Sequence, residues 1–328
     1  MTLHVTPADW QTLSDDWTDL LRRTQPPAGP FASPQFQSAW WEIFAADRTL
    51  NLLAVCDGPD LIGVLPLVER HGAIEFVGDF EICDYMDLLA APGRETDVLT
   101  ALLDHLDTHH IARADLRGLA EGSATLTHLP ALAQARGWTV DASQEAVCPT
   151  VPLAADWDTY LAGLKKKYRH EIRRKMRHLL DGGAQVSLAV FDEPQDILDR
   201  LPEFLRLMTD SRGDKATFMT DQMATFFHTL ISRLAPQRLV RFYFLTVDGA
   251  CAAAVLGFVE ERTLLLYNSG YDPAYRDLSV GIASKVFVLR DSIERGLESV
   301  NFLRGDEDYK FQLGGQPSPV TRLQLSRA

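Results

Sequence analysis

A run of charged and phenolic residues near the end of the chain has the composition of a chemical site. After a predicted strand at Ser299–Leu303, residues 304–310 read Arg-Gly-Asp-Glu-Asp-Tyr-Lys. Open α/β sheets place their sites just past the carboxyl ends of strands, where this run falls. A solvated charged turn is the alternative. The matching loop of the first half of the chain, residues 118–123, is nearly uncharged, which favours a site in the second half.

The stretch over residues 267–282 could bind an anion. It leads from a predicted strand into a predicted helix, with Ser279 at a suitable N-cap position and Gly281 in the first turn. Unpaired amides and the helix dipole both favour a phosphate at such a helix start. A capped helix that binds nothing is the alternative. The expected contacts are the amides of Val280, Gly281 and Ile282.

A strongly basic helix is predicted at the start of the second half. Between Lys165 and His178, eight lysines and arginines stand against one glutamate, a local charge of +7 that leaves −20 for the rest. Apolar residues at every third or fourth position predict one buried face. The cations then lie on the other face, which could be solvated, touch an acidic membrane or bind an anion. Lys165 and Arg169 are the candidate substrate-binding residues. The candidate ligands are an anionic substrate, donor phosphates, an acyl carrier protein and a tRNA acceptor end.

Two further cations, Arg212 and Lys215, precede an aromatic helix predicted from Phe218. They could line an acceptor pocket or belong to a surface turn.

Composition excludes several classes of protein. The 328 residues carry a net charge of −13, which argues against a general DNA-binding protein. The four cysteines are isolated, and the sequence shows no metal-ligand spacing of His, Cys and carboxylates. It contains neither 18 consecutive apolar residues nor a secretory signal. We therefore expect a cytoplasmic protein with no metal site and at most peripheral membrane contact.

The two halves of the chain repeat one order of predicted elements. Each contains an aromatic helix, two strands joined at Asp-Gly, a third strand, an amphipathic helix and a last strand that ends in Leu-Arg-Gly. The Asp-Gly pairs lie at 57–58 and 248–249, and the Leu-Arg-Gly runs at 116–118 and 303–305. Asp-Gly turns predict antiparallel hairpins, and a crossover helix predicts that the last two strands are parallel. The fold class is therefore α/β, with two units that are each a mixed, mostly antiparallel sheet flanked by helices.

The length fits the duplication. At about 150 residues per domain, 328 residues correspond to roughly two domains. Pro149 and Pro152 mark the joint between them. We expect a divergent first domain over residues 1–150 and a catalytic second domain over residues 151–328.

The chain also resembles a known enzyme family over nearly its whole length. The most specific parts are the basic run at 165–169, the Asn-Ser-Gly-Tyr-Asp-Pro loop at 268–273 and an ending at 305–310 that matches Gly-x-Glu-x-Tyr-Lys. In these parts it is similar to the BioF2-like (CelD/BcsL-type) acetyltransferases. They are tandem members of the GCN5-related N-acetyltransferase (GNAT) superfamily and share the architecture of the FemABX peptidyltransferases.

The resemblance implies transfer of an acyl group from acetyl-CoA or another acyl-CoA to an amine of a small molecule or sugar precursor. The pantetheine would lie along residues 264–268 and the pyrophosphate at residues 279–282. An amine with a pKa near 10.4 is ammonium at pH 7, so a base must take its proton. Glu307 is the first candidate and Asp306 the second. The remaining expected roles are an oxyanion amide near Asn268 or Ser269, an acid at Tyr309 and a phosphate or carboxylate contact at Lys310.

Two other interpretations stay open. A FemABX-like transferase would use aminoacyl-tRNA, which the basic helix favours. A non-catalytic scaffold would bind an acyl carrier or a sugar precursor. In the acyltransferase interpretation the first unit shapes the acceptor groove.

Overall fold

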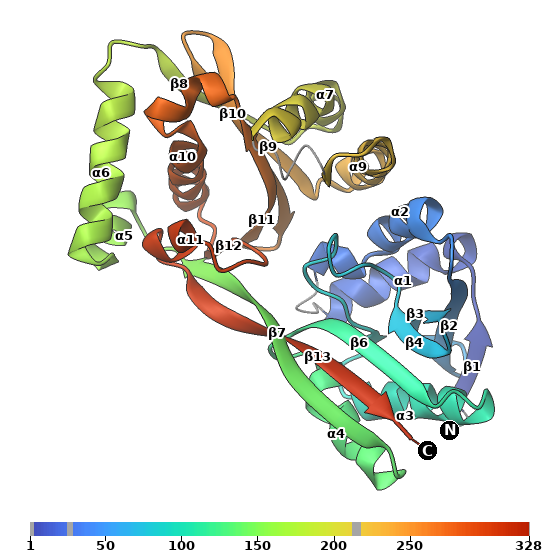
Figure 1. Ribbon diagram of the computed structural model, residues 1–328. Coiled ribbons are helices and arrows are strands. Elements are labelled where there is room, and N and C mark those ends of the chain that lie inside the picture. Colours follow the sequence, from blue (N-terminus) through green and yellow to red (C-terminus); the bar gives the residue numbers. More distant parts are fainter. Residues whose placement is uncertain (1–2, 25–28, 212–217, 328) are drawn as a thin grey trace. The chain divides into compact units, whose positions relative to one another are not determined.

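The chain divides into two units, and the division is not a cut at a single residue. The computed structural model describes residues 3–24, 29–211 and 218–327 (Figure 1). Residues 1–146 and 318–328 form the first unit, and residues 147–317 form the second. We expected residues 318–328 in the second domain. They group with the first because the last strand of the chain pairs with a strand of that unit.

A mixed sheet forms the centre of the first unit. Its strands follow the order β1-β2-β3-β4-β6-β13, with β4 and β6 parallel and the other pairs antiparallel. They are β1 (Leu3–Pro7), β2 (Thr49–Asp57), β3 (Asp60–Arg70), β4 (Ala73–Phe76), β6 (Arg113–Ala120) and β13 (Gln316–Ser326), with a short β5 (Leu89–Ala90) on β3. The helices are α1 (Trp10–Thr24), α2 (Pro34–Phe44), α3 (Glu95–Thr108) and α4 (Ala124–Ala135), and a short 3-10 helix η1 (Gly29–Ala32) precedes α2.

The second unit repeats this plan. Its strands follow the order β7-β12-β11-β10-β9-β8, again with one parallel pair, β11 and β12. They are β7 (Thr139–Pro152), whose residues 139–146 still belong to the first unit, β8 (Val186–Phe191), β9 (Val240–Val247), β10 (Ala250–Glu260), β11 (Thr263–Tyr271) and β12 (Ser299–Asn301). The helices are α5 (Trp157–Gly163), α6 (Lys166–Leu180), α7 (Pro194–Ser211), α9 (Asp221–Leu234), α10 (Val280–Glu294) and α11 (Asp308–Gln312), with 3-10 helices η2 (Ala235–Gln237) and η3 (Pro273–Leu278).

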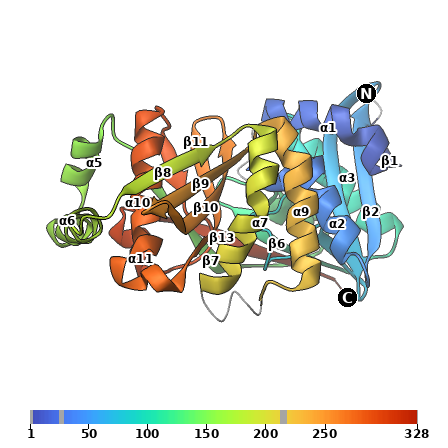
Figure 2. The same cartoon turned by 90° about the horizontal axis from the view of Figure 1, so that it is seen from above.

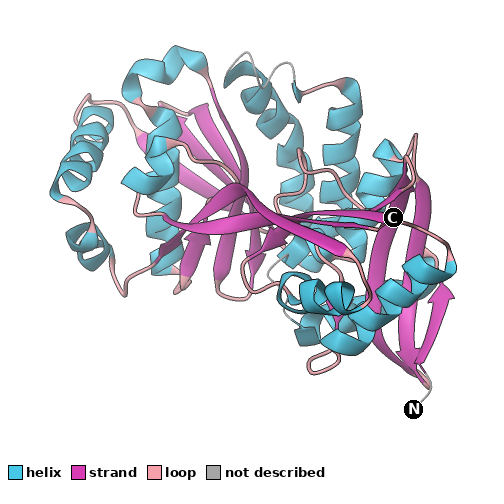
Figure 3. Cartoon of the chain, turned by 60° about the horizontal axis from the view of Figure 1, so that its bottom comes forward, coloured by secondary structure: helices cyan, strands magenta, loops and turns pink. Residues whose placement is uncertain are grey.

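Matching elements confirm the predicted duplication. The succession β1-β2-β3-β4-β6 of the first unit corresponds to β8-β9-β10-β11-β12 of the second. In each unit helices flank a mixed, mostly antiparallel sheet (Figure 3). α5 and α6 stand outside the repeat, since the described part of the first unit has no helices before β1.

The helical layers of the second unit lie on opposite faces of its sheet. α10 covers one face, α7 and α9 cover the other, and α6 lies outside α10 (Figures 1 and 2). Most buried residues of α10 are apolar, among them Ala283, Val286 and Leu289, and the buried polar ones are Ser284, Lys285 and Ser292. Each fully buried valine or leucine stabilises the fold by about 1.5–3 kcal/mol. The helix is therefore firmly seated on the sheet.

Local turn chemistry explains the hairpins. Asp248 and Gly249 join β9 to β10 with φ of 50° and 80°, the left-handed backbone that a tight hairpin turn requires. In the first unit Asp57 still pairs with Asp60, so the turn falls on Gly58 and Pro59, one residue later than predicted.

Candidate functional site

β11 carries the candidate site because its pairing with the neighbouring strand β12 ends at Leu265, while β11 itself continues to Tyr271. It pairs with β10 as far as Tyr271, but with β12 only over Thr263–Leu265. A β-bulge at Tyr267 interrupts the pairing with β10. Beyond Leu265, no strand in the described ranges pairs with the β12 side of β11. This open edge, residues 266–271, presents backbone groups that an extended ligand can pair with, over about 20 Å at 3.3 Å per residue.

One face of the open edge meets α10. Lys285 Nζ donates a hydrogen bond of 2.7 Å to Ser269 Oγ. Two residues further along the strand, the Tyr271 ring lies 3.4 Å from the position that a Cβ on Gly281 would take. Steps of two on a strand and four on a helix are similar in length, so Ser269 lies beneath Lys285 and Tyr271 beneath the start of α10.

The other face of the open edge meets α7. A Cβ on Gly270 would overlap the backbone of Leu207 and Met208, which only glycine avoids. Asn268 lies two residues before Gly270 and therefore on the same side of the strand. The predicted pair Asn268 and Ser269 is thus present at the open edge, with the two side chains on opposite faces.

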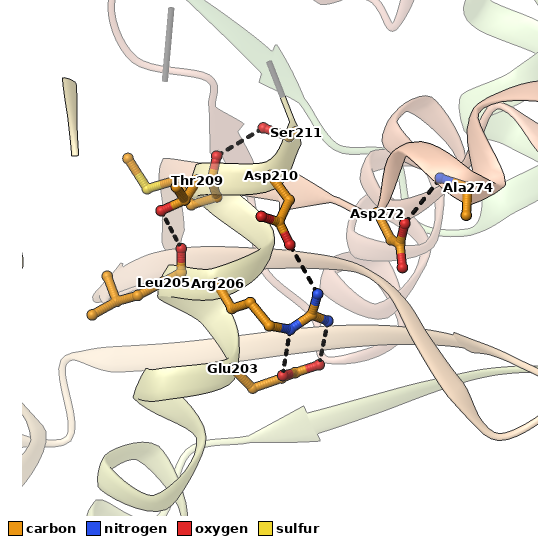
Figure 4. Close-up of polar contacts among 9 residues, drawn as sticks. Glu203, Leu205, Arg206, Thr209, Asp210, Ser211, Asp272 and Ala274 are labelled. Carbon is orange, nitrogen blue, oxygen red and sulfur yellow. Dashed lines mark hydrogen bonds and ion pairs between the residues drawn. The ribbon is translucent and has the colours of Figure 1, made fainter. Parts of the chain in front are cut away.

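Ion pairs within α7 stabilise the last turns of this helix. Arg206 donates to both carboxylate oxygens of Glu203, at 2.9 and 3.0 Å, and to Asp210 at 3.0 Å (Figure 4). After β11, Asp272 accepts a hydrogen bond of 2.9 Å from the amide of Ala274 and starts η3 (Figure 4). This turn fixes the path from the open edge to α10.

The start of α10 has the predicted position but a different geometry. Ser279 has a φ of 56°, and its hydroxyl does not cap the helix. Its carbonyl accepts hydrogen bonds of 3.0 Å from the amides of Ile282 and Ala283, so the Ile282 amide is engaged within the helix. The amides of Val280 and Gly281 precede the first helical hydrogen bond and point out of the helix start.

Lys175 of α6 stands at this helix start, and the sequence analysis did not single it out. Its Nζ lies 3.4 Å from Ser279 Oγ and 3.3 Å from Glu171 Oε1. Hydrogen bonds from Arg174 and Lys175 lower the pKa of Glu171 to about 2, against the opposing effect of burial. The basic run contained Lys175, but its spacing could not show which cation faces a helix far along the chain.

The candidate substrate-binding cations Lys165 and Arg169 lie at the start of α6, away from the start of α10. Arg169 Nη1 donates to the carbonyl of Ala162 at 3.0 Å and so caps the end of α5. Lys165 is the N-cap residue of α6, ten residues from Lys175, which is about 15 Å along the helix axis. Neither is brought to the start of α10. Arg212 and Lys215 lie outside the described residues.

Lys310 organises the charged loop after β12. Its side chain is 3% exposed, and its Nζ donates to the carbonyls of Leu303 at 3.1 Å and Arg304 at 2.6 Å. It also forms an ion pair of 3.0 Å with Glu307 Oε2. These contacts use the donors of the ammonium group within the loop, so Lys310 shapes the site rather than reaching a ligand phosphate. The backbone is left-handed at Leu303, with a φ of 54°, a strained conformation of the kind found at functional sites.

The predicted acid–base residues lie on this loop. Glu307 is the N-cap residue of α11, and its side chain is 47% exposed while Lys310 holds one oxygen. Asp306 is exposed, and Tyr309 is half-buried with its ring edge-to-face on Phe302 at 5.9 Å. Only Glu307 thus combines access to solvent with a fixed carboxylate. The loop follows the point where β12 leaves β11, at the opposite end of the open edge from the start of α10.

The first unit closes the equivalent place with its own residues. The amide of Met86 donates to the carbonyl of Gly118 at 2.9 Å, and a Cβ on Gly78 would stand 2.7 Å from Met86 Sδ. The loop after β4 therefore folds back onto β6. Ser123 and Thr125 hold it by hydrogen bonds to Asp87, whose pKa burial raises to about 6.

The helix start of the first unit also differs in charge. Glu95 and Asp97 lie in the first turn of α3, where they would repel a phosphate. Glu95 Oε1 accepts a hydrogen bond of 3.0 Å from the amide of Gly93. The closed loop and the acidic helix start therefore make the first unit a poorer match to a phosphate-bearing donor at this place than the second unit.

The described residues contain no group of three or more metal-binding side chains. Within those same ranges, no helix has the length and apolar character needed to cross a membrane.

Comparisons with known proteins agree with this geometry. Residues 166–311 match the family described as acetyltransferase (GNAT) domain. No curated protein matches the sequence. Among solved structures, FemX has a TM-score of 0.62 at 12% identity, covering 98% of this chain and 96% of its own. A tandem GNAT protein from the clavulanic acid biosynthesis pathway has a TM-score of 0.52 at 17% identity, with coverage of 99% and 98%.

A third similar structure is the C-terminal domain of a putative lysylphosphatidylglycerol synthetase from Agrobacterium fabrum, with a TM-score of 0.60 at 12% identity and coverage of 98% and 93%. At such identities these likenesses show the fold alone. The second unit is thus similar to the acetyltransferase (GNAT) family over residues 166–311, and the whole chain shares the fold of tandem GNAT proteins.

Proposed function

We propose that the protein is an N-acyltransferase that moves an acyl group from an acyl-CoA to an amine of a small molecule or sugar precursor, as the BioF2-like acetyltransferases that it resembles would. The observation that carries the proposal is the open edge of β11. At one end lies the start of α10 with Lys175 beside it, and at the other end begins the loop that carries the half-exposed Glu307.

The donor would lie along this edge. The amide groups of an extended pantetheine can pair with the backbone of residues 266–271 in the way that an added strand does. Its phosphates would meet the amides of Val280 and Gly281 and the ammonium of Lys175. The thioester would then lie toward Ser269 and the loop after β12.

Glu307 would act as the base. An amine with a pKa near 10.4 is ammonium at pH 7, and freeing it costs about 4–5 kcal/mol, so a group that accepts a proton from the nitrogen is needed beside it. The amine nitrogen bonds to the thioester carbon, the carbon–sulfur bond breaks, and the proton of the amine passes to Glu307. The departing thiolate takes a proton from Tyr309.

We expect one acetyl-CoA per chain in a calorimetric titration, because the first unit is closed. A Gly281→Glu variant should bind at least about 10-fold more weakly, since a carboxylate beside the phosphates costs several kcal/mol. A Cβ at this position meets only the Tyr271 ring at 3.4 Å, so the fold should tolerate it. Gly163→Glu adds the same charge where nothing lies within 4 Å and is the control. A wild-type protein that binds neither acetyl-CoA nor CoA would contradict the proposal.

A FemABX-like use of aminoacyl-tRNA is the second candidate, and α6 favours it. Five exposed cations of this region form no ion pair within the described ranges: Lys165, Lys166, Lys167, Arg173 and Arg177. The apolar stripe of α6 cannot insert into a membrane, because Ile172 and Leu179 are buried in the second unit. A polyanion is therefore the better match to this exposed charge.

Under this second candidate, charged tRNA should bind with a steep salt dependence. Replacing Lys165, Lys166 and Arg173 by alanine should reduce the slope of log K against log salt by about 2 to 3. Arg169 is left in place because it caps α5. The measurement is a filter-binding titration between 50 and 200 mM salt, and an unchanged slope would remove the support that α6 gives.

A further inference from the structure

Lys285 is a buried cation of α10. The residue is 6% exposed, and on the same side of the helix Val288 and Leu289 are buried apolar side chains and Ser292 is a buried hydroxyl. Taking an ammonium group out of water costs free energy that an apolar side chain at the same place would not. A lysine in such a surrounding breaks the rule that core positions are apolar, and such exceptions gather at functional sites.

The partner of Lys285 lies on the open edge. Lys285 Nζ donates to Ser269 Oγ at 2.7 Å, and Ser269 lies two residues past the bulge and four past the last pairing with β12. A hydroxyl oxygen that accepts a hydrogen bond from an ammonium group directs its own proton to a second acceptor. The adjacent positive charge also strengthens the hydroxyl as a donor.

We propose that Lys285 is a positioning residue that holds and polarises the Ser269 hydroxyl, and that this hydroxyl donates to the oxygen of the reacting thioester carbonyl. The inference rests on the proposed acyl transfer. As the amine nitrogen bonds to the carbonyl carbon, the C=O electron pair moves to oxygen, and the Ser269 hydroxyl stabilises that oxyanion. When the pair returns, the carbon–sulfur bond breaks and the thiolate leaves. Ser269 and Lys285 keep their protons throughout.

The competing role for the hydrogen bond between Lys285 and Ser269 is purely structural: it would join α10 to β11. This role makes a different prediction. Replacing both partners of a buried hydrogen bond by apolar groups of similar shape can be nearly neutral for stability. If the contact were only structural, its removal could change the free energy of unfolding but would leave kcat unchanged. An oxyanion role would lower kcat while the donor still binds, because the interaction is made only in the transition state.

The test uses acetyl-CoA with hydroxylamine as the acceptor. Hydroxylamine is mostly unprotonated at pH 7, so it can attack without first losing a proton to Glu307, and the proton that its nitrogen loses after bonding to the carbonyl carbon can pass to water. This acceptor therefore depends little on the base and tests the carbonyl step. We expect Lys285→Met and Ser269→Ala each to lower kcat by about 10- to 100-fold, with KM for acetyl-CoA within about threefold. The double variant should be no slower than either single variant, because the two groups act as one unit. Lys285→Arg, which keeps a charged donor, should recover part of the rate.

Arg290→Met is the matched control, since Arg290 is an exposed cation of the same helix that pairs with Glu294 at 2.8 Å. It should leave kcat unchanged. The inference is overturned if both Lys285→Met and Ser269→Ala stay within twofold of the wild-type kcat, or if their effects multiply in the double variant. Ser269→Ala provides a second variant should Lys285→Met unfold. No acetohydroxamate from the wild type would instead contradict the proposed function on which the inference rests.

Discussion

Glu307→Gln is expected to lower kcat for a primary-amine acceptor by about 10²- to 10⁴-fold at pH 7, the range that general acid–base catalysis contributes. Glutamine keeps the shape of the side chain, and its amide oxygen can still accept from Lys310 Nζ, so the loop should hold its conformation. It cannot take a proton. The loss should shrink as the pH rises toward the pKa of the amine, because the free amine then needs no base. The measurement is a pH series of steady-state rates.

Two neighbouring carboxylates provide the comparison for Glu307. Asp308→Asn changes an exposed carboxylate in the first turn of α11 and should leave the rate within about twofold of the wild type. Asp306→Asn tests the second candidate for the base. A greater loss in Asp306→Asn than in Glu307→Gln would transfer the role to Asp306. The Glu307→Gln variant should also keep its activity toward hydroxylamine, because that acceptor depends little on the base.

Gly270→Ala is expected to reduce the free energy of unfolding by about 3 kcal/mol or more, at the upper end of what overpacking costs. The added Cβ would overlap the backbone of Leu207 and Met208, and a helix backbone cannot turn aside as the end of a side chain can. α7 would have to move away from β11, which would also disturb the open edge. Urea unfolding of the full chain measures the change.

Gly163→Ala is the matched control for Gly270→Ala. Nothing lies within 4 Å of a Cβ at Gly163, so this substitution should change the free energy of unfolding by no more than about 0.5 kcal/mol. An unfolding midpoint of Gly270→Ala equal to that of the wild type would mean that α7 does not approach β11 as closely as the structure has it.

Features set by neighbouring residues could be predicted from the sequence. The Asp248-Gly249 turn, the strands on either side of it and the basic helix all depend on short-range chemistry. The duplication could be predicted because the same short-range motifs occur in the same order in both halves of the chain. Ser279 was placed at the helix start for the same reason, although its left-handed backbone was not foreseen.

Features set by distant contacts could not be predicted. β11 extends to Tyr271 through Asn268, Ser269 and Gly270, residue types that disfavour strands, because β10 and α7 hold them there. Lys285 and Lys310 are buried, whereas a lysine in a sequence is expected at the surface. Lys285 donates to Ser269 on another element, β11. Lys310 donates to the carbonyls of Leu303 and Arg304, which are brought to it only when the loop after β12 folds.

The return of the last strand to the first unit has a consequence for synthesis. Residues 320–326 of β13 pair with residues 113–120 of β6, so a ribosome makes the two partners about 200 residues apart. At 5–20 residues per second, β6 waits about 10–40 s with an uncovered edge while the entire second unit is translated. The amino-terminal sheet of a nascent chain therefore cannot be completed before the second unit has emerged. A chain that stalls in between would expose a strand prone to aggregation.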